Sequence, residues 1–316
     1  TAPAASRTGW IPANARQVRA RSDLPADAQA AAPCVEAANP IALTKSVAVV
    51  GERQLRDATR LSDTEEAALG DRLERSAPAA APFRGRWDRP DDVARWQGYL
   101  RDLVGHLAQH SERKGLRWRV HLVRDSSFNA AAMPGGVLMV HTGLLAGPQA
   151  VQSEAELATV LGHELAHVEL RHPVAAYQYA KAVLGADADD AAVLARMMTL
   201  PISSEYEHEA DRRGTDLAAR GQYDPEAARR LWQRMATEGG GAGPGAGGGP
   251  AGALGGVLGE LAGGLASVLA THPPPATRCA RALVQAVRWR GDPTFDVFYV
   301  GESNLAARQI GPRHPL

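Results

Sequence analysis

The chain has 316 residues, of which 45% are apolar and 22% charged, the composition of a globular protein with one large domain or two small ones. Lys plus Arg and Asp plus Glu both number 35, so the formal net charge is zero and the basic excess typical of nucleic-acid-binding proteins is absent. No run of about 20 apolar residues predicts a transmembrane helix. Cys34 and Cys279 either form one disulfide or remain separate thiols, since their spacing favours neither.

The first 60 residues are rich in alanine, proline and arginine and have weak periodicity, so we predict an irregular N-terminal arm there. A first helix is expected to begin at Ser62, whose side chain can cap it. A second helix is predicted over residues 92–111, because apolar side chains recur every three or four positions. Two strands are expected next, at residues 117–123, where apolar and polar side chains alternate, and at residues 136–140, after a Pro-Gly-Gly turn.

The strongest helix signal begins at Ser153. Ser153 and Glu156 match a capping box, a regular apolar face follows them, and Pro173 is expected to end the helix. Further helices are predicted over residues 203–221, from residue 225 onward and over residues 275–287, and a last strand over residues 295–300.

A glycine-rich insertion is predicted at residues 238–270, where glycine, alanine and proline dominate the composition. Within it, leucine and valine at residues 254–269 keep a helical period, which favours an ordinary core-packing helix over a lid or a surface for a partner or membrane. We therefore expect residues 61–316 to form one domain, which this insertion interrupts.

The strongest predicted helix contains the segment His163-Glu164-Leu165-Ala166-His167, which has the pattern H-E-x-x-H. Two histidines four positions apart lie on one face of a helix, so both imidazoles can bind one zinc ion. The glutamate after the first ligand can then take a proton from zinc-bound water. The alternative is a helix face whose histidines and glutamate are solvated or salt-bridged.

A catalytic zinc ion needs a third protein ligand and an open position for water, and residues 203–211 are the best source of that ligand. On a helix, Glu207 and Asp211 share one face, and Glu205 and Glu209 share another; geometry alone does not choose between these pairs. The pair Glu207 and Asp211 is attractive because one carboxylate can bind zinc while the other fixes the second N–H of a ligand histidine. The alternative is an acidic, solvated helix face.

These features resemble the motifs of the HtpX-like and CAAX-prenyl-protease-like zinc endopeptidases, peptidase family M48 of the gluzincin group. The similarity covers residues 61–235 and resumes at residues 271–273. Two departures are Ser204, where many relatives carry arginine, and the glycine-rich insertion. Besides H-E-x-x-H, the matching stretches are the first helix at residues 61–70, N-A-x-x-x-P-G-G at residues 129–136 with its continuation to residue 145, and E-x-E-A-D-x-x-G at residues 207–214.

The resemblance implies one zinc ion per chain, held by His163, His167 and Glu207, with Asp211 supporting a ligand histidine. It also implies peptide hydrolysis, in which zinc polarises the scissile carbonyl. Glu164 would act as the general base, moving a proton from the attacking water to the leaving amine.

The developing oxyanion needs a second electrophile besides zinc, and His272 and Arg278 are the candidates. His272 is otherwise a residue before a helix, or a group that occupies the open position of zinc and suppresses activity. Arg278 is better explained as an ion-pair partner of Asp211 or Glu209.

A peptide substrate is expected to pair with an exposed edge of the strand at residues 136–140, while the inward side chains of that strand pack in the core. Because such pairing uses main-chain groups, it depends little on the sequence of the substrate and favours unfolded chains. Asn129 is expected to bind the substrate backbone, with a turn role as the alternative. The predicted substrate-binding residues are Asn129, Gly136, Val137, Leu138 and Met139.

The sequence as a whole predicts an α+β, mainly helical zincin-type metallopeptidase domain with a small sheet, cleaving unfolded or misfolded polypeptides. The alternatives are a holdase-like binding protein that uses the same groove and a non-peptidase zinc hydrolase of the cell envelope. The resemblance implies a periplasmic protein of the bacterial cell envelope and leaves peripheral membrane association and the oligomeric state open. The chain begins at Thr1 and not at methionine, which is compatible with a signal peptide or lipidated segment removed before it.

Overall fold

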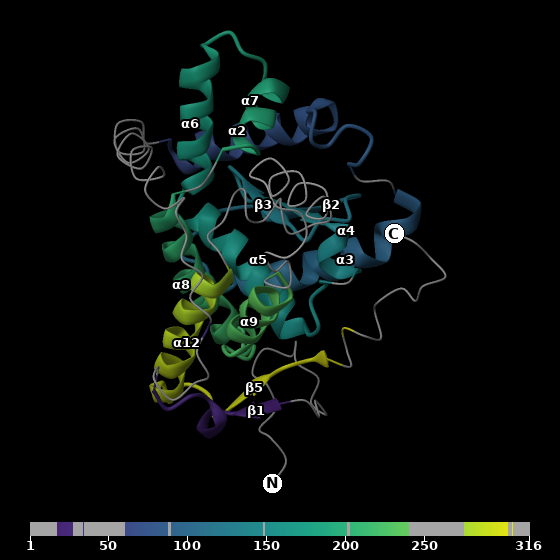
Figure 1. The fold of residues 1–316 in the computed structure, drawn as a ribbon. Coiled ribbons are helices and arrows are strands. Elements are labelled where there is room, and N and C mark those ends of the chain that lie inside the picture. The colour runs from purple at the N-terminus through teal and green to yellow at the C-terminus, as the bar shows by residue number, and fades with distance from the viewer. Residues whose placement is uncertain are drawn as a thin grey trace, which may run out of the picture.

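Helices surround a small sheet in the computed structural model of this protein (Figure 1). The predicted glycine-rich insertion lies outside the described residues from position 240 onward, as do His272 and most of the predicted N-terminal arm. The structure describes residues 18–27, 34, 61–87, 90–147, 149–200, 203–239, 275–302 and 305.

The described helices agree with an α+β, mainly helical fold. Each predicted helix that falls on described residues is present, with ends shifted by a few residues. The longer helices are α2 (Asp63–Ser76), α3 (Pro90–Ala108), α5 (Glu154–Glu169), α6 (His172–Leu184), α7 (Asp190–Met197), α8 (Ser204–Arg220), α9 (Ala227–Gly239) and α12 (Pro275–Gly291). Single turns of helix are η1 (Arg21–Asp23), η3 (Ala77–Ala79) and α4 (Thr142–Leu145).

A three-stranded sheet has the order β2 (Arg119–Val123), β4 (Val137–His141), β3 (Ala130–Met133). β2 runs parallel to β4 and β3 antiparallel to it, so β4 is the central strand and pairs on both sides. Both strand predictions in this region are confirmed. The sequence does not predict β3, because alanine, which makes up most of it, has a low strand propensity.

Helices cover both faces of this sheet. On one face, α3 and α5 share a core with Leu138 and Val140 of β4. On the other face, α2 and α7 pack with Val137 and Met139 of the same strand. Successive side chains of a strand point to opposite faces, so the unbroken apolar run of β4 fits a strand that is buried on both sides.

α5 and α8 cross with their backbones in close contact. A Cβ atom at Gly162 would lie 2.6 Å from the carbonyl oxygen of Gly214, and one at Gly214 would lie 2.5 Å from the amide nitrogen of His163. Side chains do not tolerate such distances, so glycine at both positions is what lets the helices approach this closely. Gly214, the last residue of the E-x-E-A-D-x-x-G pattern, therefore sets how near α8 comes to the H-E-x-x-H helix.

Helix capping follows the prediction only in part. Ser62 caps α2 as predicted. At the start of α5, the Ser153 side chain accepts a hydrogen bond from the amide of Glu156 at 3.1 Å. The Glu156 carboxylate, however, accepts a hydrogen bond from the amide of Gln152 at 2.8 Å, one residue before the amide that the capping box predicts, and it also pairs with Arg234 of α9 at 2.8 Å.

α6 and α7 form a helical hairpin that the sequence analysis does not predict (Figure 1). Pro173 does follow the end of α5, but it lies in the first turn of α6, where its missing N–H removes no helical hydrogen bond. Arg171, between α5 and α6, has a left-handed backbone conformation with φ of 63°. This sharp turn places His172 at the start of α6, beside the last turn of α5.

Part of the N-terminal arm that is expected to be irregular forms a strand. β1 (Val18–Ala20) pairs antiparallel with β5 (Val297–Tyr299). A disulfide joins Cys34 to Cys279 of α12, which decides between the two alternatives for the cysteines. The described part of the arm is therefore attached to the C-terminal end of the domain, both by hydrogen bonds and covalently.

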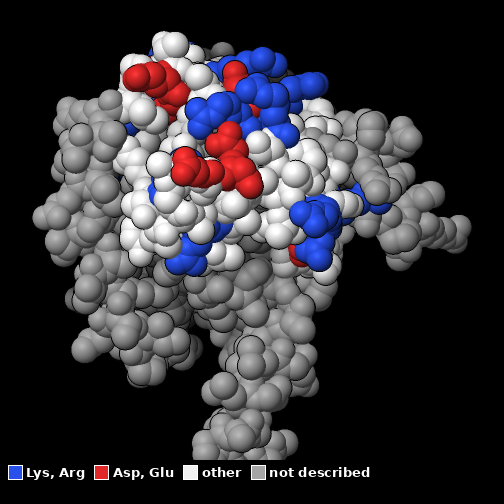
Figure 2. All heavy atoms as spheres, turned by 90° about the horizontal axis from the view of Figure 1, so that it is seen from above, with Lys and Arg blue, Asp and Glu red and all other residues white. Residues whose placement is uncertain are grey.

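Basic and acidic side chains lie next to one another on the face seen from above, where α2, α6 and α7 lie in Figure 1 (Figure 2). Arg72 of α2, for example, pairs with Asp190 of α7 at 3.1 Å. The electrostatic fields of neighbouring opposite charges cancel over short distances, which is consistent with the formal net charge of zero. Among the described helices, none combines the length and apolarity that crossing a membrane requires.

Candidate metal centre

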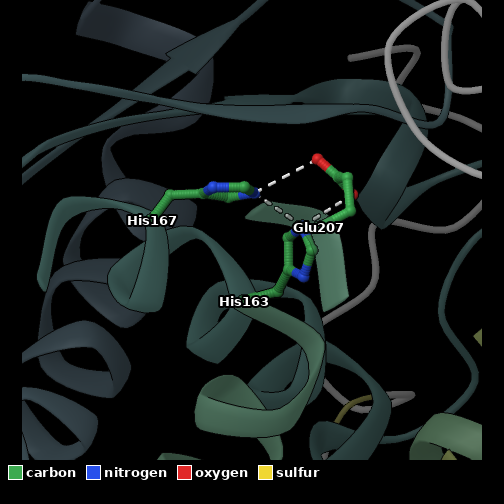
Figure 3. A group of neighbouring side chains, drawn as sticks. All are labelled: His163, His167 and Glu207. Carbon is green, nitrogen blue, oxygen red and sulfur yellow. Dashed lines mark hydrogen bonds and ion pairs between the residues drawn. The ribbon is translucent and has the colours of Figure 1, made fainter. Parts of the chain in front are cut away.

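Two helices bring together three side chains that could hold a metal ion (Figure 3). His163 and His167 lie one turn apart on α5, and Glu207 lies near the start of α8. The Nε2 atoms of the two histidines are 2.9 Å apart. The Glu207 carboxylate oxygens lie 3.5 Å from Nε2 of His163 and 3.4 Å from Nε2 of His167. All three side chains are buried, so the cluster is an interior feature and not a solvated helix face.

The donors and their spacing fit zinc. Zn²⁺ takes imidazole nitrogens and carboxylate oxygens at about 2.0–2.2 Å in a tetrahedral arrangement, which separates neighbouring ligand atoms by about 3.3 Å. The Nε2–Nε2 distance of 2.9 Å lies around that value, as do the distances of 3.5 Å from His163 to Oε2 of Glu207 and of 3.4 Å from His167 to Oε1 of Glu207. Three protein ligands leave one tetrahedral position open, which is the arrangement of catalytic zinc sites.

Asp211 of α8 supports His163 on the side away from the cluster. Its Oδ1 lies 2.9 Å from Nδ1 of His163, so Nδ1–H donates to the carboxylate and Nε2 is the nitrogen that faces Glu207. Arg278 of α12 donates to the same carboxylate at 2.6 Å, and its guanidinium lies 3.7 Å above the ring of Trp232. The expected ion pair between Arg278 and Asp211 is therefore present.

His167 is supported in a different way, through a residue that the sequence analysis does not single out. Its Nδ1 lies 2.8 Å from Nδ1 of His172, and Nε2 of His172 lies 3.2 Å from a carboxylate oxygen of Glu209. The His172 ring is buried and stacks on Tyr206 at 4.1 Å between ring centroids. The only signal in the sequence is a histidine five positions after His167, beyond the end of the zinc helix.

The electrostatics of the cluster differ between its two histidines. Burial and Arg278 lower the pKa of His163, but Glu207 and Asp211 outweigh them and raise it to about 9. Burial, together with the neighbouring His163, lowers the pKa of His167 to about 4. Burial would raise the pKa of Asp211, but Arg278 and His163 hold it well below its usual range. The carboxylates around His163 thus favour a positive charge at this position, which is where a metal ion would bind.

Known proteins share this part of the chain. A model of peptidase family M48 matches residues 94–285, which include the two ligand helices and the segment that carries Arg278. The chain belongs to peptidase family M48. The resemblance inferred from the four motifs is therefore confirmed, and the match begins within α3 and ends within α12.

Relatives within this M48 family come from mitochondria and from bacteria. The chain is 33% identical over 153 residues to the mitochondrial metalloendopeptidase OMA1 of Schizosaccharomyces pombe, covering 45% of this chain and 44% of that protein. It is 31% identical over 175 residues to OMA1 of Arabidopsis thaliana, covering 50% and 34%. It is 27% identical over 199 residues to the beta-barrel assembly-enhancing protease of Yersinia pestis, covering 56% and 39%. The matched part of the chain spans less than half the length of each relative.

A largely apolar cavity of about 260 Å³ opens beside the candidate ligands of this M48 domain. Glu164 and His167 lie in its wall, so the predicted general base borders a space that a substrate can enter. The edge strand β3 forms another part of the wall. Apolar side chains of α6, of the end of α7 and of the segment after α7 also line it, namely those of Pro173, Ala176, Met197, Met198 and Leu200.

The edge strand that borders the cavity of this M48 domain is β3, and this corrects the prediction for substrate binding. Gly136, Val137, Leu138 and Met139 are expected at an exposed edge, but the last three belong to β4, which pairs with a strand on each side. A strand at a sheet centre has no main-chain groups left for a peptide. Alternation could not reveal this, because the unpredicted β3 occupies the edge. Asn129, just before β3, does line the cavity.

Proposed function

We propose that this protein is a zinc-dependent endopeptidase that hydrolyses peptide bonds of unfolded or misfolded polypeptides. The observation that carries this proposal is the convergence of His163, His167 and Glu207 at ligand spacing, with Glu164 beside them in the wall of a cavity. Membership of the M48 family supports peptidase chemistry on polypeptides. We assign this chemistry to a domain of residues 61–316, with residues 1–60 as an N-terminal arm.

The roles of the side chains follow from their positions. A zinc ion held by the three ligands would polarise the scissile carbonyl and lower the pKa of a bound water. Glu164 is buried and lies in the cavity wall, so its carboxylate can accept a proton from the attacking water and deliver it to the leaving amine. Asp211 keeps the Nδ1–H of His163 oriented, and Arg278 keeps Asp211 ionised.

The substrate would bind as an extended strand along β3. β3 pairs with β4 on one side, and its residues Ala130–Ala132 line the cavity. Main-chain hydrogen bonds to such an edge recognise any extended peptide, which favours unfolded chains over folded ones. Asn129, just before this strand, lines the cavity, which supports its proposed contact with the substrate backbone.

His272 is the proposed second electrophile for the oxyanion. Loss of one such donor lowers kcat by about 10²- to 10³-fold while substrate binding and metal content change little. We therefore expect His272→Ala to lower kcat and to retain zinc, measured by peptide hydrolysis and metal analysis. An increase in activity would instead indicate that His272 blocks the open metal position.

The bacterial periplasm is the proposed compartment. The disulfide between Cys34 and Cys279 suits an oxidising environment, and the Yersinia pestis relative is named for beta-barrel assembly. Peripheral contact with a membrane belongs to the same proposal, and flotation of the protein with lipid vesicles tests it.

The test of the proposed function combines metal analysis with a digest of casein or of a denatured protein. We expect one zinc ion per chain and cleavage that a chelator abolishes and zinc restores. Glu164→Gln should keep zinc and lose cleavage, whereas Glu112→Gln, a change at an exposed glutamate, should keep both. A wild-type protein that suppresses aggregation but cleaves nothing would support the holdase alternative and refute the endopeptidase.

A further inference from the structure

A chain of hydrogen bonds leads from His167 to the surface of α8. Nδ1 of His167 and Nδ1 of His172 are 2.8 Å apart, and Nε2 of His172 lies 3.2 Å from Glu209. His172 is 3% exposed, whereas the Glu209 side chain is 35% exposed. The buried imidazole thus connects a metal ligand to a carboxylate that water reaches.

The proton positions along this chain follow from metal binding, so the argument rests on the proposed function. A neutral histidine that binds a metal through Nε2 carries its proton on Nδ1. The Nδ1–H of His167 then donates to Nδ1 of His172, which must offer a lone pair. His172 therefore carries its own proton on Nε2, from which it donates to Glu209. Each of the two short contacts has one donor and one acceptor in this arrangement, and in no other arrangement with His167 as an Nε2 ligand.

We propose that His172 and Glu209 are positioning residues for the metal, which hold the ring and the tautomer of His167. The partner ligand His163 receives the same support directly from Asp211. Two structural features fix His172 in place. Stacking on Tyr206, with only 5° between the ring planes, holds its ring. The left-handed turn at Arg171 brings the start of α6 back toward α5.

The test measures zinc affinity and does not depend on peptide cleavage. Loss of a group that supports a metal-binding histidine lowers the metal affinity by about 10- to 100-fold. We expect His172→Leu to raise the zinc Kd by that factor, determined by competition with a chromophoric chelator. His172→Asn should restore most of the affinity, because its side-chain oxygen can lie near the position of Nδ1 and accept from His167. Glu209→Gln should give a smaller loss, since its amide oxygen still accepts from His172.

Controls separate this role from a structural one and from failure of the proposed function. His121→Leu changes a histidine of β2 that pairs with Glu74 of α2, and it should leave the zinc Kd unchanged. The metal-free variants are compared by thermal unfolding, so that a general loss of folding is recognised. Equal affinity in His172→Leu and wild type, or equal losses in the Leu and Asn variants, would overturn the proposal. A wild-type protein that does not bind zinc would refute the proposed function itself.

Discussion

Histidine spacing alone does not make a metal site in this protein. His106 and His110 repeat the four-residue spacing of His163 and His167, and the sequence favours a solvated helix face for them. That expectation is wrong for His106, which is buried, with Nε2 3.0 Å from the carbonyl oxygen of Gly221. Burial is the main reason that the pKa of each is lowered, to about 4 for His110. At the candidate metal site, by contrast, the Glu207 carboxylate lies within 3.5 Å of both imidazoles.

His110 should make the protein sensitive to acid. Its pKa of about 4 in the folded state lies below the ordinary value of 6.5, so the unfolded chain takes up a proton first as the pH falls. The free energy of unfolding should therefore decrease between about pH 6.5 and pH 4 and show no contribution above that range. In urea titrations of the metal-free protein, His110→Gln should lose less stability on acidification than wild type. Equal losses in the two proteins would contradict this prediction.

At the scale of elements, the crossing of α5 and α8 determines the ligand geometry. Gly214→Ala would place a methyl group 2.5 Å from the backbone of His163, with no flexible side chain to move aside. We expect α8 to shift, lowering the free energy of unfolding by about 1–3 kcal/mol and weakening zinc binding, because Glu207 moves with the helix. Urea titration and zinc competition measure both effects.

Gly105→Ala is the matched control for the helix crossing. Gly105 lies in α3, and a Cβ atom there would meet no atom within 4 Å. Replacing a helical glycine by alanine at an open position should leave zinc affinity unchanged and stabilise the protein by about 0.4–1 kcal/mol. If both variants behaved alike, close packing of the two helices would not be what holds Glu207 in place.

The apolar cavity should select the side chain next to the cleaved bond. An apolar cavity of roughly 150 Å³ holds a benzene ring, so about 260 Å³ can accept a large apolar side chain. Ala176→Phe would fill part of this space. We expect this variant to lower kcat/KM by about tenfold or more for peptides with a bulky apolar residue next to the cleaved bond. The effect should be smaller for peptides with alanine at the same position. Ala182→Phe, at an exposed position on the same helix, should change neither value.

At the scale of the whole molecule, the disulfide joins segments that are 245 residues apart in sequence. A cross-link over so long a loop restricts the unfolded chain strongly, and loss of a native disulfide costs about 2–5 kcal/mol. The double variant Cys34→Ala and Cys279→Ala should lose stability in this range in urea titrations. A reductant should bring wild type to the same midpoint and leave the variant unchanged. Equal stability of the two oxidised proteins would contradict this prediction.

The sequence alone determined those features that depend on neighbouring residues. The imidazoles of His163 and His167 share a helix face because the helical period is local, and Ser62 caps α2 through contacts within one turn. The pairing of Glu207 with Asp211 was one of two arrangements that α8 allowed. The proposal of Glu207 as the third ligand follows from the family motif and not from helix geometry.

Only the tertiary structure decided which segments meet. β4 lies at the centre of the sheet because β3, a run of mostly alanine with a weak local signal, pairs along its other side. Glu156 pairs with Arg234, 78 positions away, while it accepts the amide of Gln152 at the start of its helix, and His172 meets His167 because the chain reverses at Arg171. Such contacts depend on how elements pack, and the alternation and spacing of residues along one element contain no information about its neighbours in space.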